Sequence, residues 1–310
     1  MSEEKEYQII DTHAHLDLED FDADRDEVFV RSRDGIFPKI KGTPIEPGPV
    51  KLKVAARVLP GITADSSQKT ANLARKFPFL FPGAGVHPNH LLEMKEGDWE
   101  RTVTLAEDDR TAAIGETGLD LYWHDSPIEL QYEYLLRHSL LAKRLGKPII
   151  IHCRDAEKEL MHYVTVFRQW EAGETAAEEP GFRPLTEPGA EKLLDLPPMK
   201  GVIHSYSNGP ETASELLALG FYLGFTGSVT FTGRKFAQIW ESAKIVPNDR
   251  ILLETDSPFL TPHPFRGKLE RNEPLMSAWT ARRLAELRGS DVGEIITQTA
   301  ANARRLFSIP

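Results

Sequence analysis

Short apolar runs recur along the chain, and each is bounded by Gly, Pro or polar residues. This pattern is typical of strands that are buried on both faces, as in parallel sheets. We predict eight such strands. They cover residues 7–11, 54–59, 80–86, 111–115, 148–151, 201–203, 221–225 and 250–254.

Amphipathic stretches separate these runs, so strand-like and helix-like segments alternate. The stretches cover residues 66–76, 99–107, 128–145, 156–170, 211–219, 236–244, 276–287 and 292–307. Alternation of this kind indicates parallel βα units, and eight units in about 250 residues is the usual size of a (β/α)8 barrel. We therefore predict an α/β protein with one domain over residues 1–310, a single, slightly distorted TIM barrel. Two Pro- or Gly-rich stretches without periodicity, about 36–50 and 171–198, are predicted to be surface insertions.

The composition adds only broad limits. The net charge of −10, from 37 basic and 47 acidic residues, argues against a surface that coats nucleic acid broadly. It does not exclude a nucleic-acid substrate, because bound cations can reverse the sign of the local field. The N-terminus is acidic and lacks the apolar core of a signal peptide, and no run approaches roughly 20 apolar residues. We expect a cytoplasmic protein with no membrane association and no obligate protein partner.

Six potential metal ligands stand at the ends of five of the apolar runs. A parallel barrel brings the C-terminal ends of all its strands to one face, so residues distant in sequence can meet there. Several imidazoles and two carboxylates at such a rim suit one or two divalent cations. The candidate ligands are His13, His15, Glu116, His152, His204 and Asp256.

The residue types suggest distinct roles within this set. His13 and His15 are two apart, so their side chains point the same way from a strand. Glu116 can bridge two cations with its two oxygens, and the glycines beside it allow close backbone approach. Asp256 can bind one ion and also accept a proton from an activated water. We therefore predict Asp256 and Glu116 as the catalytic residues.

These motifs resemble the TatD family of metal-dependent deoxyribonucleases, within the amidohydrolase-like barrel superfamily. The resemblance covers nearly the whole chain except the two insertions. One departure lies at the sixth strand, where the family often has His-Cys-Phe-Ser-Gly and this chain has His-Ser-Tyr-Ser-Asn over residues 204–208. The histidine is kept, so the departure concerns the lining of the site. The matching motifs are residues 9–17, 85–88, 115–120, 151–155, 254–258, 271–274 and 302–307.

The resemblance implies the same six metal ligands and a deoxyribonuclease that cleaves DNA phosphodiesters by attack of a metal-activated water. It implies two divalent ions per subunit, with Mg, Mn or Zn as candidates, and single-stranded DNA or strand ends as substrate. On this hypothesis Glu116 is shared by both ions, and His204 binds the second ion together with His152. The first ion would be held by His13, His15 and Asp256.

Residues near these ligands could contact the substrate. Arg154 and His87 are candidates to bind the phosphate. Tyr122 and Trp123 could stack on a base, although we expect them to pack against neighbouring loops. Two other functions stay open: a deacylase or amidohydrolase-type enzyme with the same metal site, for example a D-aminoacyl-tRNA deacylase, and an inert barrel that acts as a binding protein. The presence of all six ligands argues against the latter.

Overall fold

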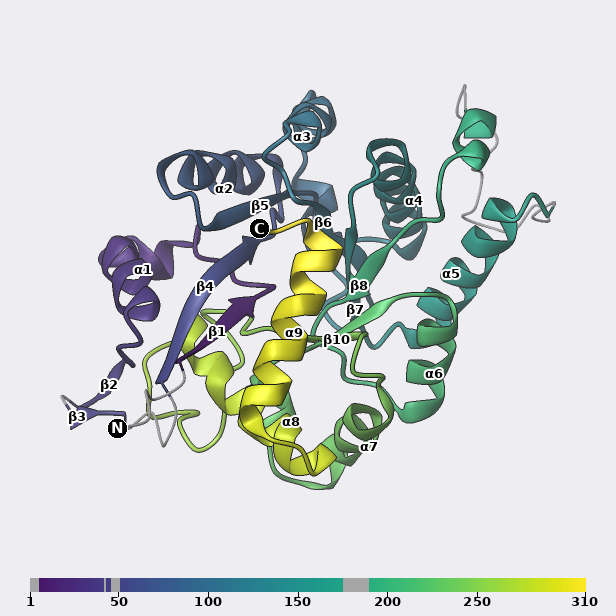
Figure 1. The fold of residues 1–310 in the computed structure, drawn as a ribbon. Coiled ribbons are helices and arrows are strands. Elements are labelled where there is room, and N and C mark those ends of the chain that lie inside the picture. Colours follow the sequence, from purple (N-terminus) through teal and green to yellow (C-terminus); the bar gives the residue numbers. More distant parts are fainter. Residues whose placement is uncertain (1–5, 42, 46–50, 175–189) are drawn as a thin grey trace.

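The computed structural model of the protein describes residues 6–41, 43–45, 51–174 and 190–310. Within these residues the main sheet has eight strands, and each pairs in parallel with the next along the chain. Backbone hydrogen bonds join the ends of the first and last strands: Thr12 N–H donates to the carbonyl of Leu253 at 3.0 Å. The predicted (β/α)8 barrel is confirmed (Figure 1). In order, its strands are β1 (Glu6–Asp11), β4 (Lys51–Leu59), β5 (Leu80–Ala84), β6 (Ala113–Asp120), β7 (Ile149–Arg154), β8 (Gly201–Ile203), β9 (Tyr222–Phe225) and β10 (Ile251–Leu253).

Helices surround the strands, and none of the described ones is both long and apolar enough to cross a membrane.

The sequence pattern did not predict the first helix, α1 (Arg25–Arg33), because its buried apolar side chains, Val28 and Phe29, are adjacent rather than spaced along one helical face. Contacts between the ring of Phe29 and those of Phe77 and Phe79 hold it in place. The helices are α1 (Arg25–Arg33), α2 (Ala64–Lys76), α3 (Asp98–Glu107), α4 (Ile128–Leu145), α5 (Glu157–Glu171), α6 (Pro210–Ala218), α7 (Ala237–Ile245), α8 (Ser277–Arg288) and α9 (Val292–Phe307), with short 3-10 turns that include η2 (Pro88–Glu93) and η4 (Ala190–Asp195).

Two strands continue beyond their predicted ends. The apolar pattern predicts that β6 ends at Gly115 and β7 at Ile151, but the ladder pairs Gly118 with His152 and Asp120 with Arg154. The pattern stops early because polar side chains line the mouth of the barrel, whereas backbone pairing does not depend on side-chain polarity. Two potential ligands, Glu116 and His152, therefore stand within strands, which fixes their directions more firmly than a loop would.

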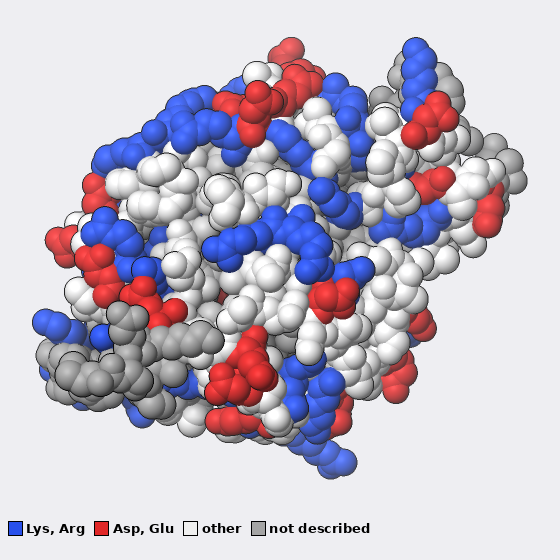
Figure 2. Space-filling model, viewed as in Figure 1, with Lys and Arg blue, Asp and Glu red and all other residues white. Residues whose placement is uncertain are grey.

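Helix α9 closes the barrel at the end where the strands begin. Its Ala303, Leu306 and Phe307 pack against side chains inside the barrel. The amide of Asn302 donates to the carbonyls of Asn248 and Ile251, at the start of β10. Figure 2 shows acidic side chains over the first half of α9 and basic ones over its second half, as the helix dipole favours. The opposite end of the barrel, where the strands finish, holds the predicted ligands.

The two predicted insertions lie at the periphery of the barrel where they are described (Figure 1). The first contains a small antiparallel pair, β2 (Lys39–Ile40) and β3 (Thr43–Pro44). The second begins as α5 ends and includes η4, and residues 175–189 lie outside the described part. The buried ammonium of Lys143 anchors its two ends, because it bonds Glu171 at 2.9 Å and the carbonyls of Leu196 and Pro197.

A buried histidine on α4 connects this helix to the end of β5. The ring of His138 is fully buried, and its Nε2 accepts the N–H of Val86 at 3.0 Å. The proton is therefore on Nδ1, which donates to the carbonyl of Tyr134 at 2.6 Å. Burial lowers the pKa of His138 to about 4, so the neutral ring is part of the folded structure.

This histidine makes the stability depend on pH. The folded-state pKa of about 4 lies below the ordinary value of 6.5, so the unfolded chain takes up a proton first as the pH falls. The favourable contribution is complete above about pH 6.5 and is lost progressively towards pH 4. For this group alone, the loss in unfolding free energy is about 3 kcal/mol.

We expect His138→Gln, which cannot titrate, to lose less stability than the wild type between pH 7 and pH 4.5. Urea unfolding at both pH values measures the difference. Replacement of the exposed His263 by Gln is the control and should keep the wild-type pH dependence. Parallel pH profiles for the wild type and His138→Gln would refute this role.

Candidate metal centre

The two histidines after β1 face each other inside the barrel mouth. His13 is completely buried, and its Nε2 lies 3.1 Å from Nε2 of His15. The buried carboxylate of Asp11 fixes this segment, because it accepts hydrogen bonds from Oγ1 and the N–H of Thr255, at 2.6 and 3.0 Å. The N–H of Asp256 donates to the carbonyl of His13 at 2.8 Å. The ends of β1 and β10 thus hold the first potential ligands in register.

Glu116 lies between two groups of imidazoles. Its Oε2 is 3.2 Å from Nε2 of His13 and 3.5 Å from Nε2 of His15. Its Oε1 is 3.1 Å from Nδ1 of His152 and 3.6 Å from Nε2 of His87. The carboxylate is almost fully buried. Each oxygen therefore faces its own set of nitrogens, which is the arrangement expected of a group that bridges two cations.

Asp256 faces the same cluster from the segment after β10. Its Oδ1 lies 3.3 Å from Nε2 of His15, 3.7 Å from that of His204 and 3.8 Å from that of His13. The backbone of Asp256 has φ +57°, in the left-handed region that few residues other than Gly, Asn and Asp adopt. In this conformation the backbone leaves the direction of β10, and the carboxylate of Asp256 faces the imidazoles.

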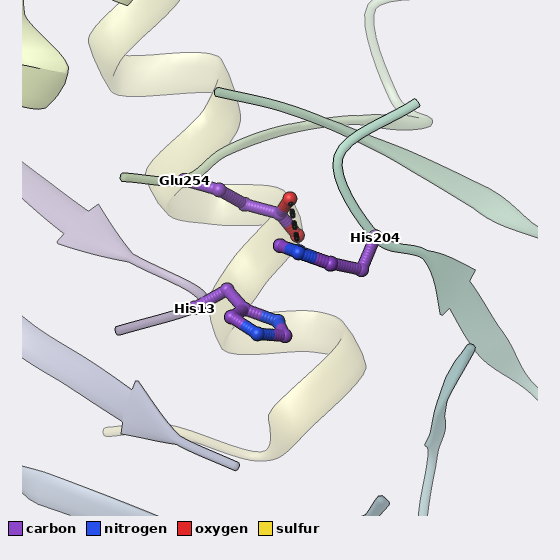
Figure 3. Close-up of side chains that lie close together, drawn as sticks. All are labelled: His13, His204 and Glu254. Carbon is purple, nitrogen blue, oxygen red and sulfur yellow. Dashed lines mark hydrogen bonds and ion pairs between the residues drawn. The ribbon is translucent and has the colours of Figure 1, made fainter. Parts of the chain in front are cut away.

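His204 stacks on His13 and is held by a buried glutamate (Figure 3). The two rings are nearly parallel, with centroids 3.4 Å apart. Glu254 Oε2 lies 2.9 Å from Nδ1 of His204 and accepts the N–H of Ser205 at the same distance. Glu254 is fully buried, and a β-carbon at Gly224 would collide with its carboxylate. A glycine at this point of β9 makes room for the carboxylate that orients His204.

The structure therefore groups the candidate ligands differently from the expected division between two ions. Three sets of side chains have ligand atoms within 4.8 Å of one another. His87 joins Glu116 and His152, the place at which His204 was expected. His204 lies instead beside His13. The sets are His13, His204 and Glu254; His13, His15 and Glu116; and His87, Glu116 and His152.

The electrostatics of the cluster suit divalent cations. Burial alone would lower the pKa of His204, but the carboxylate of Glu254 raises it to about 9. Burial would raise the pKa of Glu116, yet the neighbouring His13 holds it well below its ordinary value. Burial would raise the pKa of Asp256 as well, but its hydrogen bond to the imidazole of His15 lowers it. Ionised carboxylates packed against several imidazoles form a donor set typical of zinc and of first-row transition metals.

Unpartnered buried atoms support the same assignment. Among the described residues, Nδ1 of His13, Nδ1 of His15 and Oε1 of Glu254 are buried without a hydrogen-bond partner. Buried polar atoms without partners are uncommon in proteins and often mark the place of an ion or a water. The residues present thus fit a divalent metal centre.

Asp120 belongs to the centre, although the sequence analysis gave it no role. Its Oδ2 lies 3.0 Å from Nε2 of His152, so Asp120 orients that ring. Its Oδ1 accepts the N–H groups of Tyr122 and Trp123, at 2.9 and 3.0 Å. Burial would raise the pKa of Asp120, but His152 holds it below its ordinary value. The even spacing of Asp120 from Glu116 along a strand was the available signal, because residues two or four apart share a face.

The predicted substrate contacts lie at the edge of the cluster. His87 is largely buried against Glu116, whereas Arg154 at the end of β7 is exposed. The guanidinium of Arg154 lies over the ring of Tyr122, 3.9 Å from its centroid. Tyr122 and Trp123 are 49% and 55% exposed, so they do not pack under neighbouring loops as expected.

Comparisons with known proteins agree with this site. A sequence model of the family described as TatD related DNase matches residues 10–308. The chain is 35% identical to YabD of Bacillus subtilis, described as an uncharacterized metal-dependent hydrolase, over 97% of this chain and 99% of that protein. It is 31% identical to a protein of Erwinia tasmaniensis named 3'-5' ssDNA/RNA exonuclease TatD, over 97% of this chain and all of that protein.

A solved structure shares the fold. The crystal structure of the TatD homologue YJJV from Escherichia coli K12 superposes with a TM-score of 0.76 at 25% identity, covering 97% of this chain and 98% of that one. The resemblance expected from the sequence motifs is thus confirmed along nearly the whole chain.

The position of Asp120 behind His152 leads to a prediction about metal affinity. Replacing Asp120 with Asn removes the charge that orients the imidazole, and loss of such a partner typically weakens metal binding about 10- to 100-fold. Titration calorimetry of chelator-treated protein with Zn²⁺ or Mn²⁺ measures the change. The exposed Asp125→Asn is the matched control and should bind as the wild type does. An unchanged affinity in Asp120→Asn would show that Asp120 does not support the centre.

Proposed function

The chain belongs to the TatD related DNase family of metal-dependent hydrolases, and from this premise we propose that it hydrolyses phosphodiester bonds in DNA. Single strands or strand ends are the proposed substrate. The Erwinia protein, whose name describes an exonuclease of single-stranded DNA and RNA, supports this choice, because the similarity spans both chains almost completely.

One observation favours phosphodiester chemistry most: Glu116 faces two sets of nitrogens with its two oxygens. Paired cations recur in nucleases and phosphatases, where the two sides of an in-line displacement both develop charge. We assign His13, His15 and Asp256 to one side, with His204 stacked against His13. His87 and His152 belong to the other side.

Two divalent ions, with Mg, Mn or Zn as candidates, would neutralise phosphate charge and make water a stronger nucleophile when bound. The remaining tasks fall to the side chains. Asp256 accepts the proton of the attacking water, because its carboxylate is ionised and faces the cluster from a fixed backbone position. Glu116 contacts both sets of imidazoles, one with each carboxylate oxygen. Asp120 and Glu254 orient the rings of His152 and His204.

Arg154 and His87 are the proposed phosphate contacts. The guanidinium of Arg154 is exposed, and no carboxylate among the described residues forms an ion pair with it, so its donors are available to an anion. His87 accepts the N–H of Asn89 through Nδ1 at 3.2 Å, which leaves Nε2 directed towards Glu116. Because Nδ1 accepts, the proton of the neutral ring is on Nε2, and this nitrogen can donate to a phosphate oxygen.

The alternative of a deacylase or amidohydrolase stays a candidate only because activated water also attacks carbonyl centres. No feature of this site favours it specifically. Parallel assays on a single-stranded oligonucleotide, a D-aminoacyl-tRNA and a simple amide separate the two functions. We expect cleavage of the oligonucleotide; cleavage of the tRNA ester alone would replace the nuclease proposal.

The assigned proton acceptor can be tested by Asp256→Asn. Asparagine tolerates the left-handed backbone at this position, so the fold should be retained. Loss of a general base lowers turnover by about 100-fold or more. The rate on a single-stranded oligonucleotide with Mn²⁺ present measures the effect, with circular dichroism as the check on folding.

Two results would contradict the mechanism. Cleavage by Asp256→Asn at the wild-type rate would mean that another group accepts the proton. Full wild-type activity in excess EDTA would rule out a divalent ion at the centre.

A further inference from the structure

Two aromatic side chains stand exposed immediately beside the metal centre. Tyr122 and Trp123 belong to the turn between β6 and α4, and about half of each side chain is accessible to solvent. Their rings are perpendicular, at 86°, with centroids 4.9 Å apart. Large aromatic side chains are usually buried, and exposed ones beside a polar site often mark a binding surface.

Arg154 lies over both rings, closer to that of Tyr122 than to that of Trp123. Its guanidinium is 3.9 Å from the centroid of Tyr122 and 5.4 Å from that of Trp123. Both distances are within the range of a cation–π contact. Because the cation lies closer to Tyr122 and Trp123 is the more exposed of the two, Trp123 offers the larger accessible aromatic surface of this group. We call these three residues the aromatic platform.

The aromatic platform is fixed to a candidate metal ligand. Asp120 accepts the N–H groups of Tyr122 and Trp123 through one oxygen and contacts His152 through the other. Arg154 stands two residues beyond His152 on β7, so both side chains leave the strand on the same side, roughly 7 Å apart along it. The platform therefore cannot move independently of the site where the phosphodiester would react.

The charge around the aromatic platform favours a nucleic acid. The chain as a whole carries a net charge of −10. A second basic residue at the mouth, Arg271, is neutralised by an ion pair with Asp24 at 2.5 Å. Arg154, in contrast, forms no ion pair with any described carboxylate. An aromatic face next to an available guanidinium is the combination that binds a base and its phosphate in single strands.

We propose that the aromatic platform binds the unpaired nucleobase next to the scissile phosphodiester. The base stacks on Trp123, while Arg154 contacts the adjoining phosphate. This inference rests on the proposed phosphodiesterase function. It also gives a physical reason for a preference for single strands over duplex DNA. In a duplex the bases are stacked on each other, so their faces cannot reach Trp123. The enzyme should therefore require a frayed or single-stranded segment.

The test compares two substrates and several variants of the full-length protein loaded with Mn²⁺. One substrate is a short single-stranded oligothymidylate, and the other is an oligonucleotide of equal length with an abasic sugar at every position. Trp123→Ala should lower kcat/KM on oligothymidylate by about 10- to 100-fold, the usual effect of removing one stacking ring. The loss should fall mainly on KM, and the rate on the abasic substrate should not change.

Two further variants complete the design. Trp123→Phe keeps an aromatic face and should restore most of the activity on oligothymidylate. Ile245→Ala removes an exposed apolar side chain at the far end of the barrel and should match the wild type on both substrates.

The possible failures can be told apart. If Trp123→Ala cleaves both substrates as the wild type does, or loses activity equally on both, the aromatic platform does not bind a base, and the nuclease function stands. If the wild type cleaves neither substrate with Mn²⁺, the proposed function fails and this inference fails with it.

Discussion

A buried carboxylate is costly to keep in a folded protein unless other groups compensate its charge, and Glu116 is a buried carboxylate. It stands in the middle of a strand, and its two oxygens face imidazoles that come from the segments after β1 and β5 and from β7. Several strands must therefore end at the same depth around one carboxylate. The arrangement of the barrel mouth follows from this requirement.

The groups around Glu116 are fixed by a second set of buried acids. Asp11 bonds Thr255 and the backbone of His13 and so holds β1 beside β10. Glu254 fixes the ring of His204, and Asp120 fixes that of His152. Each acid accepts more than one hydrogen bond, which offsets its own burial. The imidazoles consequently keep their directions without relying on loops.

The sequence predicted the barrel well, because apolar runs alternate with amphipathic stretches over most of the chain. It also placed the candidate ligands at one mouth, since parallel strands end together. The prediction from the sequence was wrong where a helix or strand lacks the apolar pattern that is typical of it. Helix α1 lacks an apolar stripe and is held by aromatic contacts of Phe29 that no local pattern reveals. The strands that contain Glu116 and His152 continue into the polar mouth.

The partners of individual ligands could not be predicted for a related reason. Strand order shows which residues meet at the mouth, but the tilt of the strands and the backbone turns after them decide which side chains touch. The left-handed backbone at Asp256 and the stacking of His204 on His13 are of this kind. His87 comes from the segment after β5, beside β6 and its Glu116, whereas His204 follows β8 directly and reaches the His13 side of the cluster.

The candidate metal centre and the aromatic platform share the same two strands. β6 presents Glu116 and Asp120 and then turns directly into Tyr122 and Trp123, while β7 presents His152 and, two residues later, Arg154. The ladder pairs Asp120, the last residue of β6, with Arg154, so the start of the turn and the exposed cation are held at one level. A displacement of either strand would disturb an ion ligand and the aromatic surface together. On the proposed function, a substrate bound at this surface is already aligned with the cluster, and its alignment needs no separate binding domain.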